Sequence, residues 1–294
     1  MESHEEGRGQ NSEQRALEYT GEGVSAGISR RTLLMGALGI AGTALAPGLG
    51  FAAPCPVTIT PRQTRGPFFP FDHVVAHPLR EDPDFKGPLV LANDDDLTRL
   101  QGKPGMAQGQ IIYFRGQILR SMSGEKAGTN LCQPLAYATV VLWQANSFGR
   151  YNHRGDSSSD LTFPHPKTGK LIERVYDDHF QYYGKAVTDE QGQFQFKTIL
   201  PGFYPAADDW YRPPHLHFSV RADGIPEFVT QTYFKGEALP EHELIEELNA
   251  KDWILRDPRM PSDQQERVIV EFQKDSAGEM ADGLVGSCQM LVPA

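Results

Sequence analysis

The stretch from Arg212 to Phe218 reads RPPHLHF and places two histidines two residues apart, directly after a pair of prolines. Side chains at positions i and i+2 of a β-strand leave the same face, so His215 and His217 can point at one atom. Neutral imidazole is a common ligand of iron, copper and zinc, and Phe218 and Val220 continue the segment with residues that favour strands. The segment therefore predicts a strand that carries a paired metal ligand. The alternative is two polar positions on the solvent-facing side of a half-buried strand.

Short segments rich in Val, Ile, Thr, Tyr and Phe recur on both sides of this stretch. The chain also holds 29 Gly and 22 Pro, which favour turns between short strands. The predicted strands are residues 111–119, 138–144, 181–188, 193–198, 215–220, 228–234 and 267–272. One helix is predicted, at residues 240–249. The pattern indicates an all-β fold, an antiparallel β-sandwich, with long loops at residues 145–180 and 200–214 of the kind that carry active sites.

The composition is that of a globular protein. The chain has 294 residues, of which 39% are hydrophobic and 22% charged, and its formal net charge is −10. A negative charge of this size, with no run of Lys or Arg, argues against a nucleic-acid or anionic membrane partner.

The first residues are typical of an export signal. Residues 1–28 are polar, and Ser29-Arg30-Arg31-Thr32-Leu33-Leu34 opens an apolar stretch that runs to about Ala46. This arrangement resembles a twin-arginine signal, and the stretch is too short for a membrane span. We expect cleavage after Ala52 or Ala53, a leader over residues 1–53, one domain over residues 54–294, and a periplasmic or secreted mature protein. A chance arginine pair before a buried helix is the alternative.

Three cysteines, Cys55, Cys132 and Cys288, match no zinc-binding spacing. An odd number leaves at least one of them unpaired. One disulfide is compatible with an oxidising compartment, and three pairings are open.

Two predicted strands end in glycine-containing turns that each present a tyrosine. Residues 143–151 read WQANSFGRY and end in Tyr151, and residues 199–205 read ILPGFYP and present Tyr204. A phenol ionises near pH 10, so only a strongly Lewis-acidic ion holds it as phenolate at neutral pH. Taken alone, each tyrosine is interpreted as an aromatic side chain of a turn that packs at the edge of the core. Two phenolates together with two imidazoles suit Fe(III).

Five stretches together resemble the intradiol ring-cleaving dioxygenases, most closely the iron-bearing β subunit type of protocatechuate 3,4-dioxygenase. They occur in the family's order and are GPFFP at 66–70, WQANSFGRY at 143–151, TDEQGQFQFKTILPGFYP at 188–205, RPPHLHFSV at 212–220 and TQTYFKGE at 230–237. The resemblance implies a mononuclear non-haem Fe(III) bound by Tyr151, Tyr204, His215 and His217. It also implies that the sandwich is prealbumin-like.

The resemblance further implies the reaction and its partners. A catecholic small molecule and O2 would react by cleavage between the two hydroxyl-bearing carbons, giving a cis,cis-muconate-type product. Arg212 and Gln231 would steady charge on the ring, and Tyr204 would leave the iron and take up a substrate proton.

The turn around Gly66 would line a substrate pocket. In the family this turn serves either its own site or that of a neighbouring subunit, so Thr64, Gly66 and Pro67 are predicted pocket residues and a homo-oligomer is compatible with the sequence.

The chain departs from the family pattern at two places. Phe69 stands where a tyrosine is common, and residues 203–209 lack a Trp-Arg-Asn run of the protocatechuate enzymes. These departures leave the identity of the catechol open. The region before Gly66 is too short for the helical domain of catechol 1,2-dioxygenases, which argues against that branch.

Two other kinds of protein share part of this pattern. A cupin also uses His-x-His, but it needs a glutamate where this chain has Val220 and Arg221. The second alternative is an exported prealbumin-like sandwich that binds a ligand or carbohydrate without catalytic iron.

The other acidic and histidine motifs are interpreted as loop or surface features without a functional role. Asp94 to Asp96 read as a solvated acidic loop. Surface or loop positions are expected for the remaining histidines, His73, His77, His153, His165, His179 and His242.

Overall fold

A computed structural model describes residues 53–54, 59–69, 94–100, 102–122, 131–152, 156, 161–207 and 209–293. The chain divides into residues 1–48 and residues 49–294, and all described residues belong to the second unit. The twin-arginine motif, together with His73, His77 and His153, therefore lies outside the described residues.

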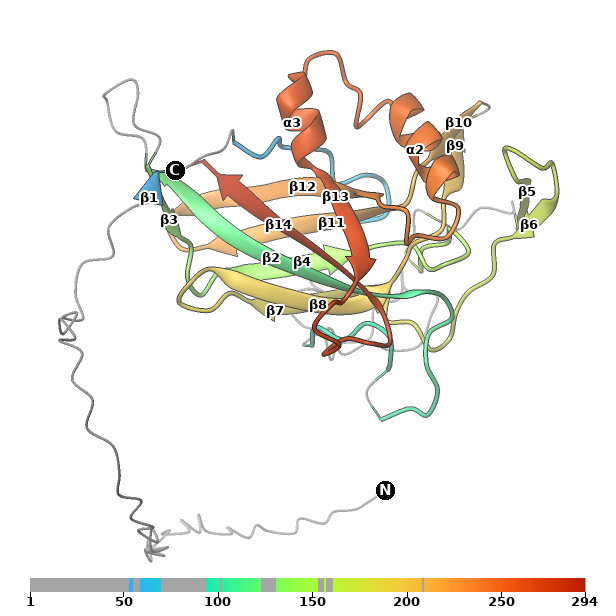
Figure 1. Ribbon diagram of the computed structural model, residues 1–294, viewed down its shortest axis with the longest axis horizontal. Coiled ribbons are helices and arrows are strands. Elements are labelled where there is room, and N and C mark those ends of the chain that lie inside the picture. The colour runs from blue at the N-terminus through green and yellow to red at the C-terminus, as the bar shows by residue number, and fades with distance from the viewer. Residues whose placement is uncertain are drawn as a thin grey trace, which may run out of the picture. The chain divides into compact units, whose positions relative to one another are not determined.

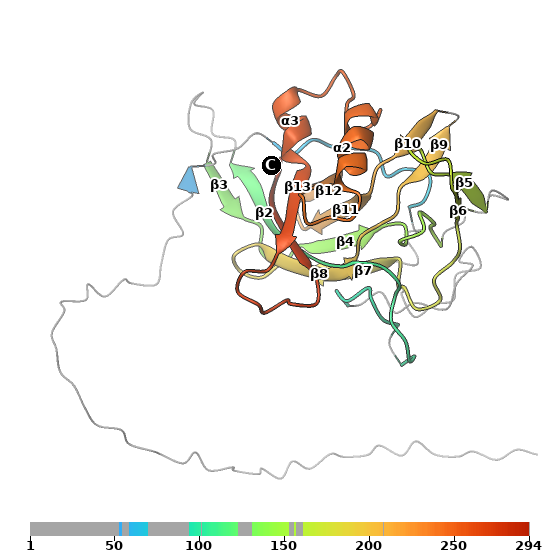
Figure 2. The same cartoon turned by 45° about the vertical axis from the view of Figure 1, so that its right-hand side comes forward.

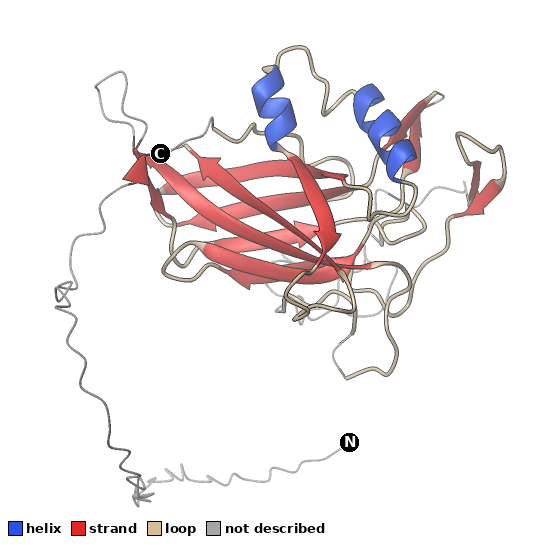
Figure 3. Cartoon of the chain, in the orientation of Figure 1, coloured by secondary structure: helices blue, strands red, loops and turns tan. Residues whose placement is uncertain are grey.

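The described chain is built mainly from strands (Figure 3). The strands are β1 (Ala53–Pro54), β2 (Ile111–Met122), β3 (Leu131–Pro134), β4 (Thr139–Trp143), β5 (Thr162–Pro164), β6 (Leu171–Glu173), β7 (Tyr183–Val187), β8 (Gln193–Ile199), β9 (Tyr204–Ala207), β10 (Trp210–Arg212), β11 (His215–Ala222), β12 (Ile225–Lys235), β13 (Ile269–Lys274) and β14 (Leu284–Val292). The helices are α2 (His242–Lys251) and α3 (Ser262–Arg267).

The main sheet has ten strands in the order β1-β3-β2-β14-β13-β12-β11-β4-β7, and β8 also pairs with β2 (Figure 1). Its pairings are antiparallel with two exceptions, because β14 runs parallel to β2 and β13 runs parallel to β12. The prediction of an antiparallel sheet is wrong for these two pairs. The parallel pairing of β12 with β13 requires a crossover connection between the two strands. Residues 236–268, which include both helices, form this crossover.

The sheet curls so that its two halves pack face to face. Phe114 of β2 lies 4.8 Å, between ring centroids, from Phe218 of β11, although β2 and β11 are not neighbours in the sheet. Phe196 of β8 contacts the same ring from the β2 side. The burial pattern of β8, which alternates between exposed or half-buried and buried positions, is what a strand with one face in a core requires. The all-β sandwich predicted from the sequence is confirmed.

Each of the seven predicted strands is present, with ends that differ by a few residues. The long segments at 145–180 and 200–214 contain two short hairpins, β5–β6 and β9–β10. Figure 2 shows both hairpins at the end of the sheet where α2 lies, and the hydroxyl of Tyr211 in β10 donates to the carbonyl of Pro164 in β5 at 3.0 Å.

The prediction of one short helix is wrong, because the described residues form two. The predicted helix at 240–249 corresponds to α2, which buries Leu244, Ile245 and Leu248 at helical spacing. Leu244 and Leu248 pack against Phe163 and Phe203, so α2 holds the loops around both hairpins. None of the described helices is long and apolar enough to cross a membrane.

The cysteines differ in state. Cys132 is disulfide-bonded, and Cys288 is a free thiol on β14. Burial raises the pKa of the Cys288 thiol to about 12.

Candidate metal and substrate site

The turns that present the two tyrosines touch each other through glycines. The carbonyl of Asn146 accepts hydrogen bonds from the N–H groups of both Gly149 and Gly202. A Cβ on Gly202 would lie 2.5 Å from the backbone nitrogen of Gly149, and one on Gly149 would lie 2.4 Å from the carbonyl oxygen of Phe203. Only glycine fits such an approach, and Gly149 also has a φ of +69°. The close contact brings Tyr151 and Tyr204 to one place.

His215 and His217 lie on the same face of β11, as their spacing predicts, and both are buried. Their ring centroids are 4.8 Å apart. His217 stands opposite Trp143 of β4, and the two rings stack at 4.8 Å. A buried neighbour in the adjacent strand thus fixes the orientation of this imidazole.

The two tyrosines and two histidines converge. The hydroxyl oxygen of Tyr151 lies 3.4 Å from Nε2 of His215. The ring of Tyr204 is 5.8 Å from that of Tyr151 and 5.8 Å from that of His215, between centroids. These four side chains come from three separate segments of the chain. The described residues contain no cluster of three His, Cys, Asp or Glu that could hold a metal, so tyrosine oxygens would have to complete a donor set here.

His215 is held in the state that binds a metal. Its Nδ1 lies 2.7 Å from the carbonyl of Pro213, which can only accept, so Nδ1 carries the proton and Nε2 keeps its lone pair. Burial, together with Arg212 and His217, sets the pKa of His215 well below its ordinary value. The imidazole is therefore neutral at physiological pH.

The tyrosines are neutral phenols unless a cation joins them. Burial raises the pKa of Tyr151 well above its ordinary value, and burial also raises the pKa of Tyr204 despite the opposing effect of Arg212. Two convergent phenol oxygens and two imidazole nitrogens fit a hard, highly charged ion, which would displace the phenolic protons.

Arg212 lies beside this cluster in a buried ion pair that the sequence did not reveal. Its Nε donates to Asp252 at 2.7 Å, and one terminal nitrogen, Nη2, donates to Oε1 of Gln231 at 2.7 Å. Its other terminal nitrogen, Nη1, has no hydrogen-bond partner among the described residues. Gln231 in turn donates from Nε2 to the carbonyl of Thr64. Arg212 and Gln231, predicted together, are therefore parts of one network.

A cavity of about 480 Å³ opens beside the cluster. Thr64, Gly66, Pro67 and Phe68 line one side, and residues 204–206, Trp210 and Arg212 line another. Gly66 has a φ of +70°, and a Cβ there would lie 3.4 Å from Cε1 of His217. The three predicted pocket residues therefore lie at the site of their own chain. Their role in substrate binding stays a prediction.

Phe69, which stands where the family commonly has a tyrosine, packs within the site. Its ring packs edge-on against Trp143 at 4.6 Å, and the guanidinium of Arg65 lies over it at 4.5 Å. Phe68 stacks on Tyr151 at 4.5 Å. Both aromatics of the turn thus pack against residues of the site.

A second buried ion pair, between Asp156 and Arg174, also lines the cavity and was not predicted. Asp156 accepts from the N–H of Tyr151 at 2.7 Å and from Arg174 at 2.8 Å. Arg174 donates from Nε and Nη2 to the carbonyl of Gly149. The pair fixes the backbone that presents Tyr151. Asp156 lies in a polar loop sequence and Arg174 directly follows the short strand β6, and no motif in the sequence marked either of them.

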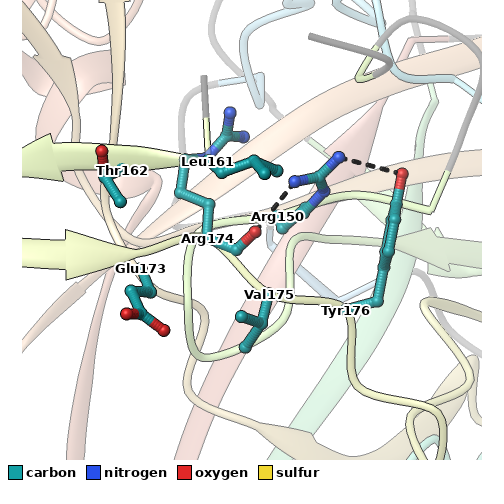
Figure 4. A pocket seen from close by; sticks show the side chains of 7 residues that line it. All are labelled: Arg150, Leu161, Thr162, Glu173, Arg174, Val175 and Tyr176. Atoms are coloured by element: carbon teal, nitrogen blue, oxygen red, sulfur yellow. Dashed lines mark hydrogen bonds between the residues drawn. The ribbon is translucent and has the colours of Figure 1, made fainter. Parts of the chain in front are cut away.

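Arg150 adds further hydrogen bonds between the two segments that carry Tyr151 and Arg174. As Figure 4 shows, it reaches between the carbonyl of Arg174 and the hydroxyl of Tyr176, at 2.8 and 3.2 Å. Arg150 and Arg174 thus each bind the other's segment. The hollow drawn there, of about 470 Å³, is separate from the cavity at the tyrosines except for their shared lining residue, Arg174.

The acidic segment at Asp94 to Asp96 and the described histidines outside the site form hydrogen bonds, lie at exposed positions or begin a helix. Asp96 accepts from the N–H of Thr98 at 2.9 Å, and Asp94 accepts from Gln181. Burial raises the pKa of Asp94, so this segment is less solvated than predicted. His165 lies 3.1 Å from Glu241, His179 is exposed and His242 starts α2.

Comparisons with known proteins agree with this arrangement. Residues 81–275 match the model of the family described as Dioxygenase. The chain is 30% identical over 196 residues to the protocatechuate 3,4-dioxygenase beta chain of Burkholderia cepacia, covering 66% of this chain and 67% of the relative. It is 37% identical over 167 residues to a chlorocatechol 1,2-dioxygenase of Pseudomonas putida, covering 52% and 54%.

Among solved structures, an intradiol ring-cleavage dioxygenase from Tetranychus urticae is similar, with a TM-score of 0.48 and 19% identity over 81% of this chain and 95% of that one. The chain spans about half to two thirds of the length of the two relatives from bacteria. The family match covers most of the chain and includes all four convergent donors. The chain therefore belongs to the intradiol ring-cleavage dioxygenase family.

Proposed function

We propose that this protein is a non-haem Fe(III) dioxygenase that cleaves a catecholic ring between its two hydroxyl-bearing carbons with O2, giving a cis,cis-muconate-type product. The observation that carries the proposal is the convergence of Tyr151, Tyr204, His215 and His217 beside a cavity. The alternative of a ligand-binding sandwich without iron is not favoured, because the family is one of dioxygenases.

Iron, when bound by these four side chains, would supply Lewis acidity and would make a coordinated catechol reactive towards O2. The chain's own residues would transfer the proton and stabilise the developing charge. Tyr204 lines the cavity, so its phenolate oxygen is placed to take a proton from a catechol hydroxyl.

Arg212 would stabilise negative charge that develops on the ring. Its Nε and Nη2 are fixed by Asp252 and Gln231, which leaves Nη1 to face a substrate. A donor that is already oriented costs little reorganisation when charge develops. Gln231 acts by holding Arg212 and by tying the turn at Thr64 to β12.

The test is oxygen uptake by iron-loaded protein with catechol, protocatechuate, hydroxyquinol and gallate. We expect a red to purple protein, from phenolate-to-iron charge transfer, that consumes one O2 per ring and yields a muconate-type product. A protein with one iron per chain that cleaves no catechol would contradict the proposal.

We also propose export by the twin-arginine pathway, on the strength of Arg30 and Arg31 before the apolar stretch. Replacing both arginines by lysine should retain the protein, with its leader, inside the cell. An unchanged distribution between cell fractions would argue against this pathway.

A further inference from the structure

The charged groups of the described cavity wall are already neutralised. Three charged residues line it, Asp156, Arg174 and Arg212. Asp156 and Arg174 bind each other at 2.8 Å, and both are at least 95% buried. Arg212 is paired with the fully buried Asp252 behind it at 2.7 Å. A carboxylate on the substrate ring would therefore meet no uncompensated cation in this wall, and desolvating it would be costly.

One side of the wall is aromatic and extends to the surface. Trp210 lines the cavity and stacks on Trp253 with ring centroids 4.6 Å apart and an interplanar angle of 13°. Trp253 is 65% exposed, which is a large apolar surface to leave in water. Ile254, the next residue, lines the cavity directly.

This aromatic wall is anchored by the same carboxylate that holds Arg212. Asp252 accepts hydrogen bonds from the N–H groups of Ile254 and Leu255 at 3.1 and 2.7 Å through Oδ1. Its Oδ2 accepts from Arg212. The turn that carries Trp253 is thus fixed relative to the guanidinium of Arg212. The stacked pair of Trp210 and Trp253 is therefore held in place beside the cavity.

The cavity is larger than one ring needs. A closed cavity of about 150 Å³ is enough to hold benzene. The cavity here measures about 480 Å³, which leaves room for a second ring beside the one that reacts.

We infer that the site takes an uncharged catechol that carries a planar aryl substituent, with the substituent packed against the wall formed by Trp210 and backed by Trp253. This inference rests on the proposed function and narrows its substrate class. The relevant property is a neutral second ring, because the wall offers apolar and aromatic surface and no unpaired charge.

The first experiment measures binding, independently of turnover. The iron-free full-length protein is titrated by calorimetry with 4-phenylcatechol, catechol and protocatechuate. We expect 4-phenylcatechol to bind at least tenfold more tightly than protocatechuate and roughly three- to tenfold more tightly than catechol. Equal affinities, or tighter binding of protocatechuate, would overturn the inference.

The second experiment compares kcat/KM for the same three catechols in iron-loaded wild type and in Trp210→Leu, Trp210→Phe and Trp253→Ala variants. Trp210→Leu should lower kcat/KM for 4-phenylcatechol roughly tenfold more than for catechol, chiefly through KM. Trp210→Phe should recover most of that loss, and Trp253→Ala should give a smaller loss with the same preference. Tyr137→Ala is the matched control, because Tyr137 is also an exposed aromatic, at 68%, in a turn before β4.

Two failures are distinguishable. If catechol is cleaved but 4-phenylcatechol is not preferred, or if Trp210→Leu affects both substrates equally, the aryl site is wrong and the proposed reaction stands. If no catechol is cleaved by iron-loaded protein, the proposed reaction is wrong, and the calorimetric ranking still decides whether the cavity selects a neutral aryl group.

Discussion

Arg212 carries a full charge while only 5% of the residue is exposed, so its surroundings must offset the loss of hydration. Asp252 neutralises it, and Gln231 accepts a further hydrogen bond from Nη2. A buried pair of this kind is weak evidence for stability, because replacing both partners by apolar residues is often neutral. Its location at a cavity wall favours a role in orienting charge.

We expect Arg212→Ala to keep the colour of the iron-loaded protein and to lower kcat by roughly a hundred- to a thousandfold, the usual effect of removing one oriented donor. Oxygen uptake and the visible spectrum measure the two outcomes. Arg259→Ala serves as control, because Arg259 is paired with Asp257 but its side chain is 88% exposed. Wild-type turnover by Arg212→Ala would show that the assigned role is wrong.

Cys288 provides a prediction that is independent of iron. Its thiol is partly buried on β14, and this burial raises its pKa to about 12, so little of it is the reactive thiolate at pH 8. Since the folded pKa lies above that of an unfolded thiol, alkylation by iodoacetamide at pH 8 should be slower in the native protein than in urea. Mass spectrometry of the tryptic peptide reports the rate. Equal labelling rates in the native protein and in urea would contradict this expectation.

At the scale of elements, the site depends on two turns meeting backbone to backbone. Gly149 and Gly169 have nearly the same φ, +69° and +68°, but a Cβ on Gly149 would collide with the carbonyl of Phe203 while one on Gly169 would meet nothing within 4 Å. The two positions therefore separate the cost of a left-handed backbone from the cost of the close approach.

We expect Gly169→Ala to lower the free energy of unfolding by about 1 kcal/mol, from backbone strain alone. Gly149→Ala should lose about 1–3 kcal/mol more, because the two turns must move apart. Urea denaturation measures both variants, and iron content per chain shows whether the tyrosines still converge in Gly149→Ala. Equal losses at the two positions would mean that the approach of the turns is not tight.

The success of prediction from sequence also varied by element. Strands with alternating or continuous apolar residues, such as β2 and β11, were predicted because periodicity reflects burial directly. β14 was missed, since Gly286, Ser287 and Gln289 interrupt its apolar residues. α3 was missed because its sequence, SDQQER, buries no side chain and so has no hydrophobic period.

The residues of the site divide in the same way. The spacing of His215 and His217 predicted that they share one face of a strand, and the resemblance to the dioxygenase family joined them to the two tyrosine turns. Asp252, Asp156 and Arg174 were not predicted, because no spacing or motif in the sequence marks their ion pairs, which only the folded chain shows. Charged residues in polar loops look alike until the tertiary structure shows which ones are buried.

At the scale of the whole molecule, the proposed iron ligands join segments that lie apart in the chain. Tyr151 follows β4, Tyr204 begins β9, and His215 and His217 lie on β11. In the unfolded chain these donors are not held together, so an ion that binds all four binds the native state and stabilises it by mass action. The same ion offsets the unfavourable burial of two ionised phenols.

We therefore expect iron removal to lower the melting temperature. At a free iron concentration a thousandfold above Kd, the linkage amounts to about 4 kcal/mol, which corresponds to roughly 10 °C for a domain of this size. Differential scanning calorimetry of iron-loaded and chelated protein measures the shift. Tyr204→Phe and His217→Ala should each reduce it, because each removes one donor, whereas His179→Ala should leave it unchanged, because His179 is exposed. A full shift in both donor variants would show that iron binds elsewhere in the molecule.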